Sequence, residues 1–270
     1  MEMANLPLSP EEAGRLAVMA EAERANEYLY EILEIGQQML QSGAEVSRVE
    51  DSLRRLCFSF GAERADVLTI TASIVVTVYS HRFGAITQTR RIEGMKYDLN
   101  RLELLNQLCR LVCSEHLGPE DMHAALEEIM SVPQYSFGVQ LFTYVLISSS
   151  FSLFFGGSAA DAVVSGVIGM ILKCLERSIQ GVNASPFLSA MLCSCLGGLL
   201  AGLAVHFGLG DSVDMISIGN IMLLIPGIAL TNSLRDMFSG NTISGLMRFI
   251  EAILLALTIA CGFALAANFL

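Results

Sequence analysis

The chain has 270 residues, of which 53% are hydrophobic, and a formal net charge of −11. Twelve of the 16 Lys and Arg residues and 21 of the 27 Asp and Glu residues precede residue 136. The negative charge argues against nucleic acid or an anionic membrane surface as a partner, and its uneven distribution indicates a soluble half joined to a membrane half. The seven cysteines include no CxxC pair, so we interpret them as small buried apolar residues and expect neither a metal site nor a disulfide framework.

The first half is predicted to begin with two helices. Residues 1–10 are expected to be a flexible lead without a cleavable signal. A helical pattern then runs from residue 10 to about residue 40. Ser42 and Glu45 fit a capping box at the start of a second, amphipathic helix, which Gly61 closes.

After residue 66 the spacing of apolar residues changes to every second position, which predicts β-structure. Apolar and polar residues alternate over residues 67–79, which predicts one long half-buried strand with Leu68, Ile70 and Ile74 on the same side. A turn at 81–84 leads to a partner strand over 85–92, and helices are expected over about 99–116 and 119–130. Residues 11–132 are therefore predicted to form a small α+β domain.

The second half, residues 136–270, is predicted to be a bundle of membrane-spanning helices. A span needs about 20 apolar residues, because a rise of ~1.5 Å per residue must cross ~30 Å of hydrocarbon. Five stretches fit: about 136–155, 159–176, 187–208, 214–232 and 249–269. The four cations of this half then fall on the side of the N-terminal domain, which predicts that this domain is cytoplasmic and the C-terminus outside; they are Lys173, Arg177, Arg235 and Arg248.

The fourth span carries the most informative pattern. Pro226 lacks a backbone N–H, so a helix is expected to kink or break there. Asn232, Arg235, Asp236 and Ser239 follow at helical spacing on one face. Broken helices and ionisable groups at membrane depth are typical of transporter sites, because they survive only against protein or a water-filled cavity. The alternative is a cytoplasmic helix hairpin with a solvated Arg–Asp salt bridge.

The candidate site follows from this pattern. We expect Arg235 to bind a substrate carboxylate with its planar fork, and Asp236 to bind an ammonium group or a coupling proton. The substrate-binding candidates are Asn220, Pro226, Gly227, Asn232, Arg235 and Asp236, and the coupling candidates are Asp161, Asp236 and Glu251. No catalytic residue, metal ligand or cofactor is predicted. His206 with a nearby serine is all that an intramembrane enzyme would have, and Arg248 is a simple pairing partner for Glu251.

Three blocks of the chain resemble the threonine/serine exporter family: EIGQQMLQSGAEVSRVEDSL, the segment TITASIVVTVYS with ITQTRRI, and IPGIALTNSLRDMFSGNTISGLMRFIEA. The likeness covers about residues 24–268. It implies a cytoplasmic domain followed by membrane helices in a bacterial inner membrane. It also implies export of small polar metabolites such as threonine and serine, driven by the proton gradient.

One departure from the family pattern concerns the number of spans. Full-length members carry a second bundle, so this chain is expected to act as the large subunit of a two-component form with a separate small membrane subunit, as a homo- or hetero-oligomer. Some such pairs are associated with dicarboxylate export, which leaves succinate as an alternative substrate. A membrane-tethered sensor that binds a ligand in the soluble domain is a second alternative.

Overall fold

The computed structural model describes residues 9–70, 72–180 and 185–268, which form two compact units. Unit 1 contains the chain up to Val132 together with Thr231–Arg248, and unit 2 contains Pro133–Leu230 and Phe249–Leu270. Nearly all of the lead predicted over residues 1–10 lies outside the described residues, as do part of the loop after the second predicted span and the end of the fifth span.

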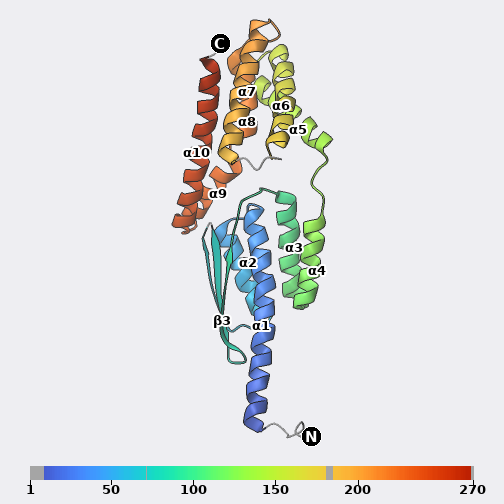
Figure 1. Cartoon of the computed structure of the whole chain (residues 1–270), viewed down its shortest axis with the longest axis vertical. Helices are drawn as coiled ribbons and strands as arrows, with labels where there is room; N and C mark the ends of the chain where they lie inside the picture. Colours follow the sequence, from blue (N-terminus) through green and yellow to red (C-terminus); the bar gives the residue numbers. More distant parts are fainter. Residues whose placement is uncertain (1–8, 71, 181–184, 269–270) are drawn as a thin grey trace, which may run out of the picture. The chain divides into compact units, whose positions relative to one another are not determined.

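Helix α1 (Pro10–Gln41) is central in unit 1 (Figure 1). A capping box sets its start: Ser9 Oγ accepts the Glu12 N–H at 3.2 Å, and Glu12 Oε2 accepts the Ser9 N–H at 2.9 Å. Helix α2 (Val46–Ser59) begins later than predicted, because Ser42 is the C-cap of α1 and Glu45 is the N-cap of α2. The capping box predicted for Ser42 and Glu45 is therefore wrong: Ser42 keeps helical backbone angles and still belongs to the preceding helix.

A three-stranded antiparallel sheet packs against α1 and α2, in the order β1 (Arg64–Ile70), β2 (Ser73–Ser80) and β3 (Gly84–Arg91). The predicted turn and the β2–β3 hairpin are confirmed, but the single long strand over 67–79 is wrong. The chain reverses between Ile70 and Ser73, which face each other in the register, and Thr71 lies outside the described residues.

The reversal changes which residues face the core. Leu68 and Ile70 are 62% and 43% exposed, whereas Ile74 is buried and its cross-strand partner Thr69 is 2% exposed. A hairpin with a tight turn places paired residues on the same face, so the phase of the alternation shifts by one. Both strands have period two and no Gly, Pro or Asn marks the turn, so the sequence pattern does not reveal the reversal.

Helices α3 (Leu99–Glu115) and α4 (Pro119–Ser131), which confirm the two predicted helices, pack on α1 away from the sheet (Figure 1). One apolar core joins these layers. Its fully buried members include Leu29, Ile32, Leu33, Leu53, Leu56, Ile74, Leu105 and Met122. Among the cysteines, burial raises the pKa of Cys57 and Cys109 to about 12, which fits buried apolar residues; Cys174 and Cys261 are instead exposed, contrary to expectation.

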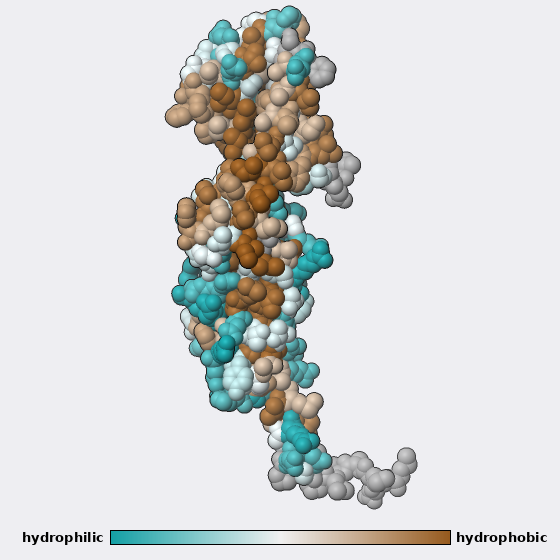
Figure 2. All heavy atoms as spheres, turned by 90° about the vertical axis from the view of Figure 1, so that its left-hand side faces the viewer, coloured by the Kyte–Doolittle hydropathy of each residue, from teal (hydrophilic) through white to brown (hydrophobic). Residues whose placement is uncertain are grey.

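Unit 2 is helical in its described part. It contains α5 (Phe137–Phe154), α6 (Ala159–Gln180), α7 (Pro186–His206), α8 (Val213–Leu224), the start of α9 (Gly227–Phe238) and most of α10 (Thr242–Ala267). Figure 2 shows hydrophobic residues over much of the visible face of this unit. Small residues let the helices approach closely: a side chain at Gly262 would collide with Ser194 of α7.

The described helices include three that are long and apolar enough to cross a membrane, namely α5, α7 and α10. Helices α8 and α9 pass the same test together and are bent by 55° at their break, so they add a fourth candidate span. The break expected at Pro226 is confirmed. Helix α6 is not among the candidates, because Asp161, Lys173, Glu176 and Arg177 lie along it. Five spans are therefore more than helix length and composition support.

The hairpin can be tested with two alanine substitutions that a single strand would make equivalent. Ile74→Ala is expected to lower the free energy of unfolding of unit 1 by about 2–5 kcal/mol, because it leaves a cavity in a packed core. Leu68→Ala is expected to change it by less than about 0.5 kcal/mol, because that side chain is exposed. Thermal unfolding and amide hydrogen exchange of the sheet would measure both, and equal losses would contradict the hairpin.

Candidate functional site

The first turn of α2 is held by a side chain from a distant part of unit 1. The N-cap residue Glu45 makes no side-chain capping bond. Instead, Asp236 of α9 accepts the Val46 N–H on Oδ1 at 3.0 Å. A carboxylate at this position satisfies one of the unpaired amides of the helix N-terminus and interacts favourably with the positive end of the helix dipole.

Asp236 is also half of a buried ion pair. Its Oδ2 lies 3.3 Å from Nη1 of Arg248 in the first turns of α10, and the two residues are 0% and 3% exposed. The same Nη1 donates to the Ala44 carbonyl oxygen at 3.2 Å. Arg248 Nε is buried without a hydrogen-bond partner among the described residues. The partner of Arg248 is thus Asp236, where the sequence had suggested Glu251.

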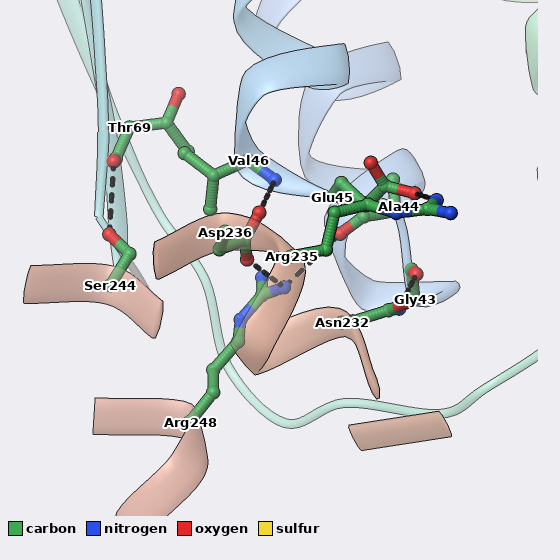
Figure 3. Close-up of polar contacts among 10 residues, drawn as sticks. All are labelled: Gly43, Ala44, Glu45, Val46, Thr69, Asn232, Arg235, Asp236, Ser244 and Arg248. Carbon is green, nitrogen blue, oxygen red and sulfur yellow. Dashed lines mark hydrogen bonds and ion pairs between the residues drawn. The ribbon is translucent and has the colours of Figure 1, made fainter. Parts of the chain in front are cut away.

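Three flanking contacts complete this arrangement, which we call the loop clamp (Figure 3). Asn232 Nδ2 donates to the Gly43 carbonyl at 2.9 Å, Ser244 Oγ donates to the Thr69 carbonyl at 3.4 Å, and Arg235 forms an ion pair with Glu45. The loop clamp therefore consists of five side chains that bind Gly43–Val46 and Thr69, namely Asn232, Arg235, Asp236, Ser244 and Arg248. Arg235 and Asp236 have separate partners, so the solvated salt bridge between them is not formed.

A half-buried carboxylate lies next to the clamp. Glu50 of α2 accepts the Thr69 N–H at 2.8 Å. Burial raises the pKa of the Glu50 carboxyl above its ordinary value, and the Asp236 charge adds to this rise, while the Thr69 hydrogen bond and Arg54 oppose it. Glu50 thus lies beside the buried pair of Asp236 and Arg248, and its carboxyl is affected by the Asp236 charge.

A second polar cluster lies inside unit 2. Asn220 of α8 is fully buried; its Oδ1 accepts the Ser148 hydroxyl at 3.0 Å, and its Nδ2 donates to Ser165 Oγ at 3.3 Å and to the Ile216 carbonyl at 2.9 Å. Ser152 Oγ is buried without a partner in the described chain. We call Ser148, Ser152, Ser165 and Asn220 the bundle cluster.

The bundle cluster forms where α5, α6 and α8 approach closely. Ser165 Oγ donates to the Ser148 carbonyl at 3.1 Å, and a side chain at Gly219 would collide with both residues. Pro226 follows Asn220 in the same segment and has no N–H with which to continue the helical hydrogen bonds beyond Leu224. Buried polar groups and interrupted backbone thus occur close together along this segment.

The predicted site residues therefore fall into two groups. Asn220, Pro226 and Gly227 belong to unit 2, whereas Asn232, Arg235 and Asp236 contact the loop between α1 and α2. Sequence reasoning missed Ser148 and Ser165, although hydroxyls within an apolar span could have indicated them. It also missed the role of Arg248, a lone cation at the start of an apolar helix.

The other coupling candidates have different surroundings. Asp161 is 1% exposed and accepts backbone N–H groups of Ser158, Asp211 and Ser212 at 3.0, 2.7 and 3.0 Å. These bonds fix the start of α6 to the loop before α8, which is a structural task. Glu251 of α10 is exposed.

Comparisons with known proteins identify relatives of the chain. The family model of the threonine/serine exporter, ThrE, matches residues 31–270. The chain is 22% identical to "Threonine/serine exporter" of Corynebacterium glutamicum over 84% of its own length and 48% of that protein. It is 22% identical to "Probable succinate transporter subunit YjjP" of Klebsiella aerogenes over 84% of its own length and 88% of that protein.

A third relative is "Probable threonine/serine exporter" of Mycobacterium tuberculosis, with 21% identity over 85% of the chain and 44% of that protein. The chain thus spans about half the length of the two exporters and most of the length of the succinate transporter subunit. No solved structure matches the chain.

The loop clamp can be tested by removing one of its buried charges. Asp236→Asn is expected to cost about 3–5 kcal/mol, because it leaves Arg248 buried and unpaired. Arg235→Ala, which removes an ion pair to a largely exposed arginine, is expected to cost at most about 1 kcal/mol. Thermal unfolding and hydrogen exchange at the Val46 amide would measure both effects.

The double variant Asp236→Asn/Arg248→Met provides the control for this experiment. Since it removes both charges, its cost is expected to be smaller than the sum of the single costs. The amide oxygen of the substituted side chain can still accept the Val46 N–H, so an unchanged free energy of unfolding in Asp236→Asn is the result that would show that the buried ion pair does not form in solution.

Proposed function

The chain belongs to the threonine/serine exporter family, and on this premise we propose that it is a membrane transport protein that exports small polar metabolites of the threonine and serine class. The proposal includes proton coupling and a substrate site beside the break between α8 and α9. It also includes the sidedness expected from the sequence: a cytoplasmic domain over residues 11–132 and a membrane domain over residues 136–270 with an external C-terminus.

The observation that carries the proposal is the bundle cluster beside a broken helix. Hydroxyl and amide groups are costly in an apolar bundle unless they are paired, so a buried group of four, with Ser152 Oγ unpaired in the described chain, needs an explanation. Such groups can exchange hydrogen bonds with the hydroxyl and amino groups of a small polar substrate. The N-terminus of α9 presents the backbone N–H groups of Ile228 and Ala229 to a substrate carboxylate. The N–H groups of Gly227 and Leu230 already donate to backbone carbonyls.

The loop clamp has a different place in this proposal. Asn232, Arg235 and Asp236 are bound to Gly43–Val46, so they can bind substrate only after the clamp opens. We therefore assign them to control of the broken helix. The proton that drives transport would bind to Glu251, whose side chain is exposed, or to Asp236 after the clamp has released it. Asp161 is the weakest of the three candidates, because backbone N–H groups occupy its carboxylate.

A dicarboxylate such as succinate is the second candidate substrate. The observation that favours it is the length of the match to the Klebsiella aerogenes succinate transporter subunit, because the chain spans 88% of that protein. The name of this relative, a transporter "subunit", also supports a separate small membrane subunit as the partner of this chain. Flux of labelled threonine, serine and succinate in proteoliposomes, with and without a candidate small subunit, separates these alternatives.

Transport through the bundle cluster predicts a specific effect of Asn220→Ala. This change removes hydrogen bonds inside the cluster, and flux is expected to fall about tenfold or more. The matched control is Asn268→Ala near the end of α10, where the amide is exposed and flux should be unchanged. Thermal unfolding must show that both variants are folded; a folded Asn220→Ala protein with full flux would exclude this site.

The proposed topology with five spans predicts a labelling pattern. In a cysteine-free background, probes at Ser178 and Asn241 are expected to react only from the cytoplasmic side, and probes at Ser158 and Ser212 only from outside. Labelling of position 178 from outside would show that α6 does not cross the membrane as proposed.

A further inference from the structure

A cavity of about 380 Å³ lies in unit 1, apart from the loop clamp. Four segments that are distant in sequence form it: α1, the end of α2, the turn between β2 and β3, and the end of α3. The residues that bear its chemistry are Glu21, Arg24, Tyr28, Phe60, Arg82 and His116. Its volume falls within the ~300–1,000 Å³ that is usual for small-molecule sites.

Two guanidinium groups at this cavity form no direct ion pair with a carboxylate of the described chain, although the Arg82 charge still acts on Glu63. Most arginines of unit 1 form ion pairs, for example Arg55 with Asp51 and Arg90 with Glu34. Among the described residues, neither Arg24 nor Arg82 forms one, and the Arg24 guanidinium lies over the Tyr28 ring, 5.9 Å from its centroid. In a unit where acidic residues outnumber basic ones, two unpaired cations at one cavity favour an anionic ligand.

His116 can also contact a ligand in this cavity. It ends α3 with φ +53°, the single non-glycine residue with positive φ in the described chain. Its Nδ1 lies 3.0 Å from the Ser59 carbonyl oxygen. Because a carbonyl only accepts, Nδ1 carries the proton and Nε2 remains for another contact. A strained backbone at a cavity is a frequent mark of a functional position.

The aromatic side chains give the cavity a rigid wall. Phe60 stacks between Tyr28 and Phe83, with ring centroids 5.2 and 6.1 Å apart. Three stacked rings resist collapse of the cavity and offer apolar surface to the body of a ligand. Glu21 supplies a single acceptor that suits an ammonium or hydroxyl group.

We propose that this cavity binds a small carboxylate metabolite, whose carboxylate lies between Arg24 and Arg82 and whose polar remainder contacts Glu21 and His116. The carboxylate suits guanidinium forks, and an amino acid or a short dicarboxylate both fit the volume. The site makes unit 1 a ligand-binding module in its own right. It does not rest on the proposed transport function.

The test is equilibrium dialysis of the purified full chain in detergent with labelled threonine, serine or succinate, and with inorganic phosphate as a non-carboxylate anion. At least one carboxylate is expected to bind saturably, and Arg24→Gln and Arg82→Gln are each expected to weaken it about tenfold or more. Arg64→Gln, which removes an exposed arginine paired with Asp66 outside the cavity, is the matched control and should leave binding unchanged.

Two further variants separate this site from others. His116→Asn keeps a residue that tolerates positive φ, so it should fold normally and still weaken binding. Asn220→Ala alters the proposed transport site and should leave this binding intact. The arginine substitutions are therefore also combined with Asn220→Ala. Absence of saturable carboxylate binding to Asn220→Ala, binding of phosphate alone, or carboxylate binding to Asn220→Ala that survives both arginine substitutions would overturn the proposal.

Discussion

The buried pair of Asp236 and Arg248 is the contact on which the arrangement of unit 1 depends. Residues 190 positions apart meet when the Asp236 carboxylate caps α2 at Val46, and Arg248 is held in turn by the Ala44 carbonyl. Two charges removed from water are costly unless each one is paired and hydrogen-bonded. The pair therefore contributes specificity rather than much net stability, because other placements of the segment 231–248 would leave a charge buried alone.

This contact joins two of the sequence blocks that resemble the exporter family. The SGAEV loop supplies backbone groups, and the TNSLRDMFSGNTISGLMR segment supplies the side chains that bind them. The second half of a broken helix is thereby attached to the α+β unit, while the first half stays in the membrane unit. The loop between α1 and α2 therefore directly contacts the part of α9 that follows the break.

The polar groups of the chain divide into clusters with different chemistry. The bundle cluster is uncharged and consists of hydroxyls and an amide, which suits a polar substrate in an apolar surrounding. The loop clamp is ionic, and its Asp236 carboxylate is bound by Val46 and Arg248. The cavity near His116 is cationic and open to solvent on an acidic unit. The sites that we propose therefore lie at separate places on one chain.

The sequence by itself determined the elements with strong local causes. Hydrophobic periodicity and capping residues predicted α1, α3 and α4, and Pro226 predicted the break between α8 and α9, because these features act within a few residues. Only the tertiary structure decided the hairpin between Ile70 and Ser73, since period-two alternation is the same on either side of a reversal. It also decided the partners of Arg235 and Asp236. Helical spacing places side chains on one face, but only packing brings Glu45, Val46 and Arg248 to that face.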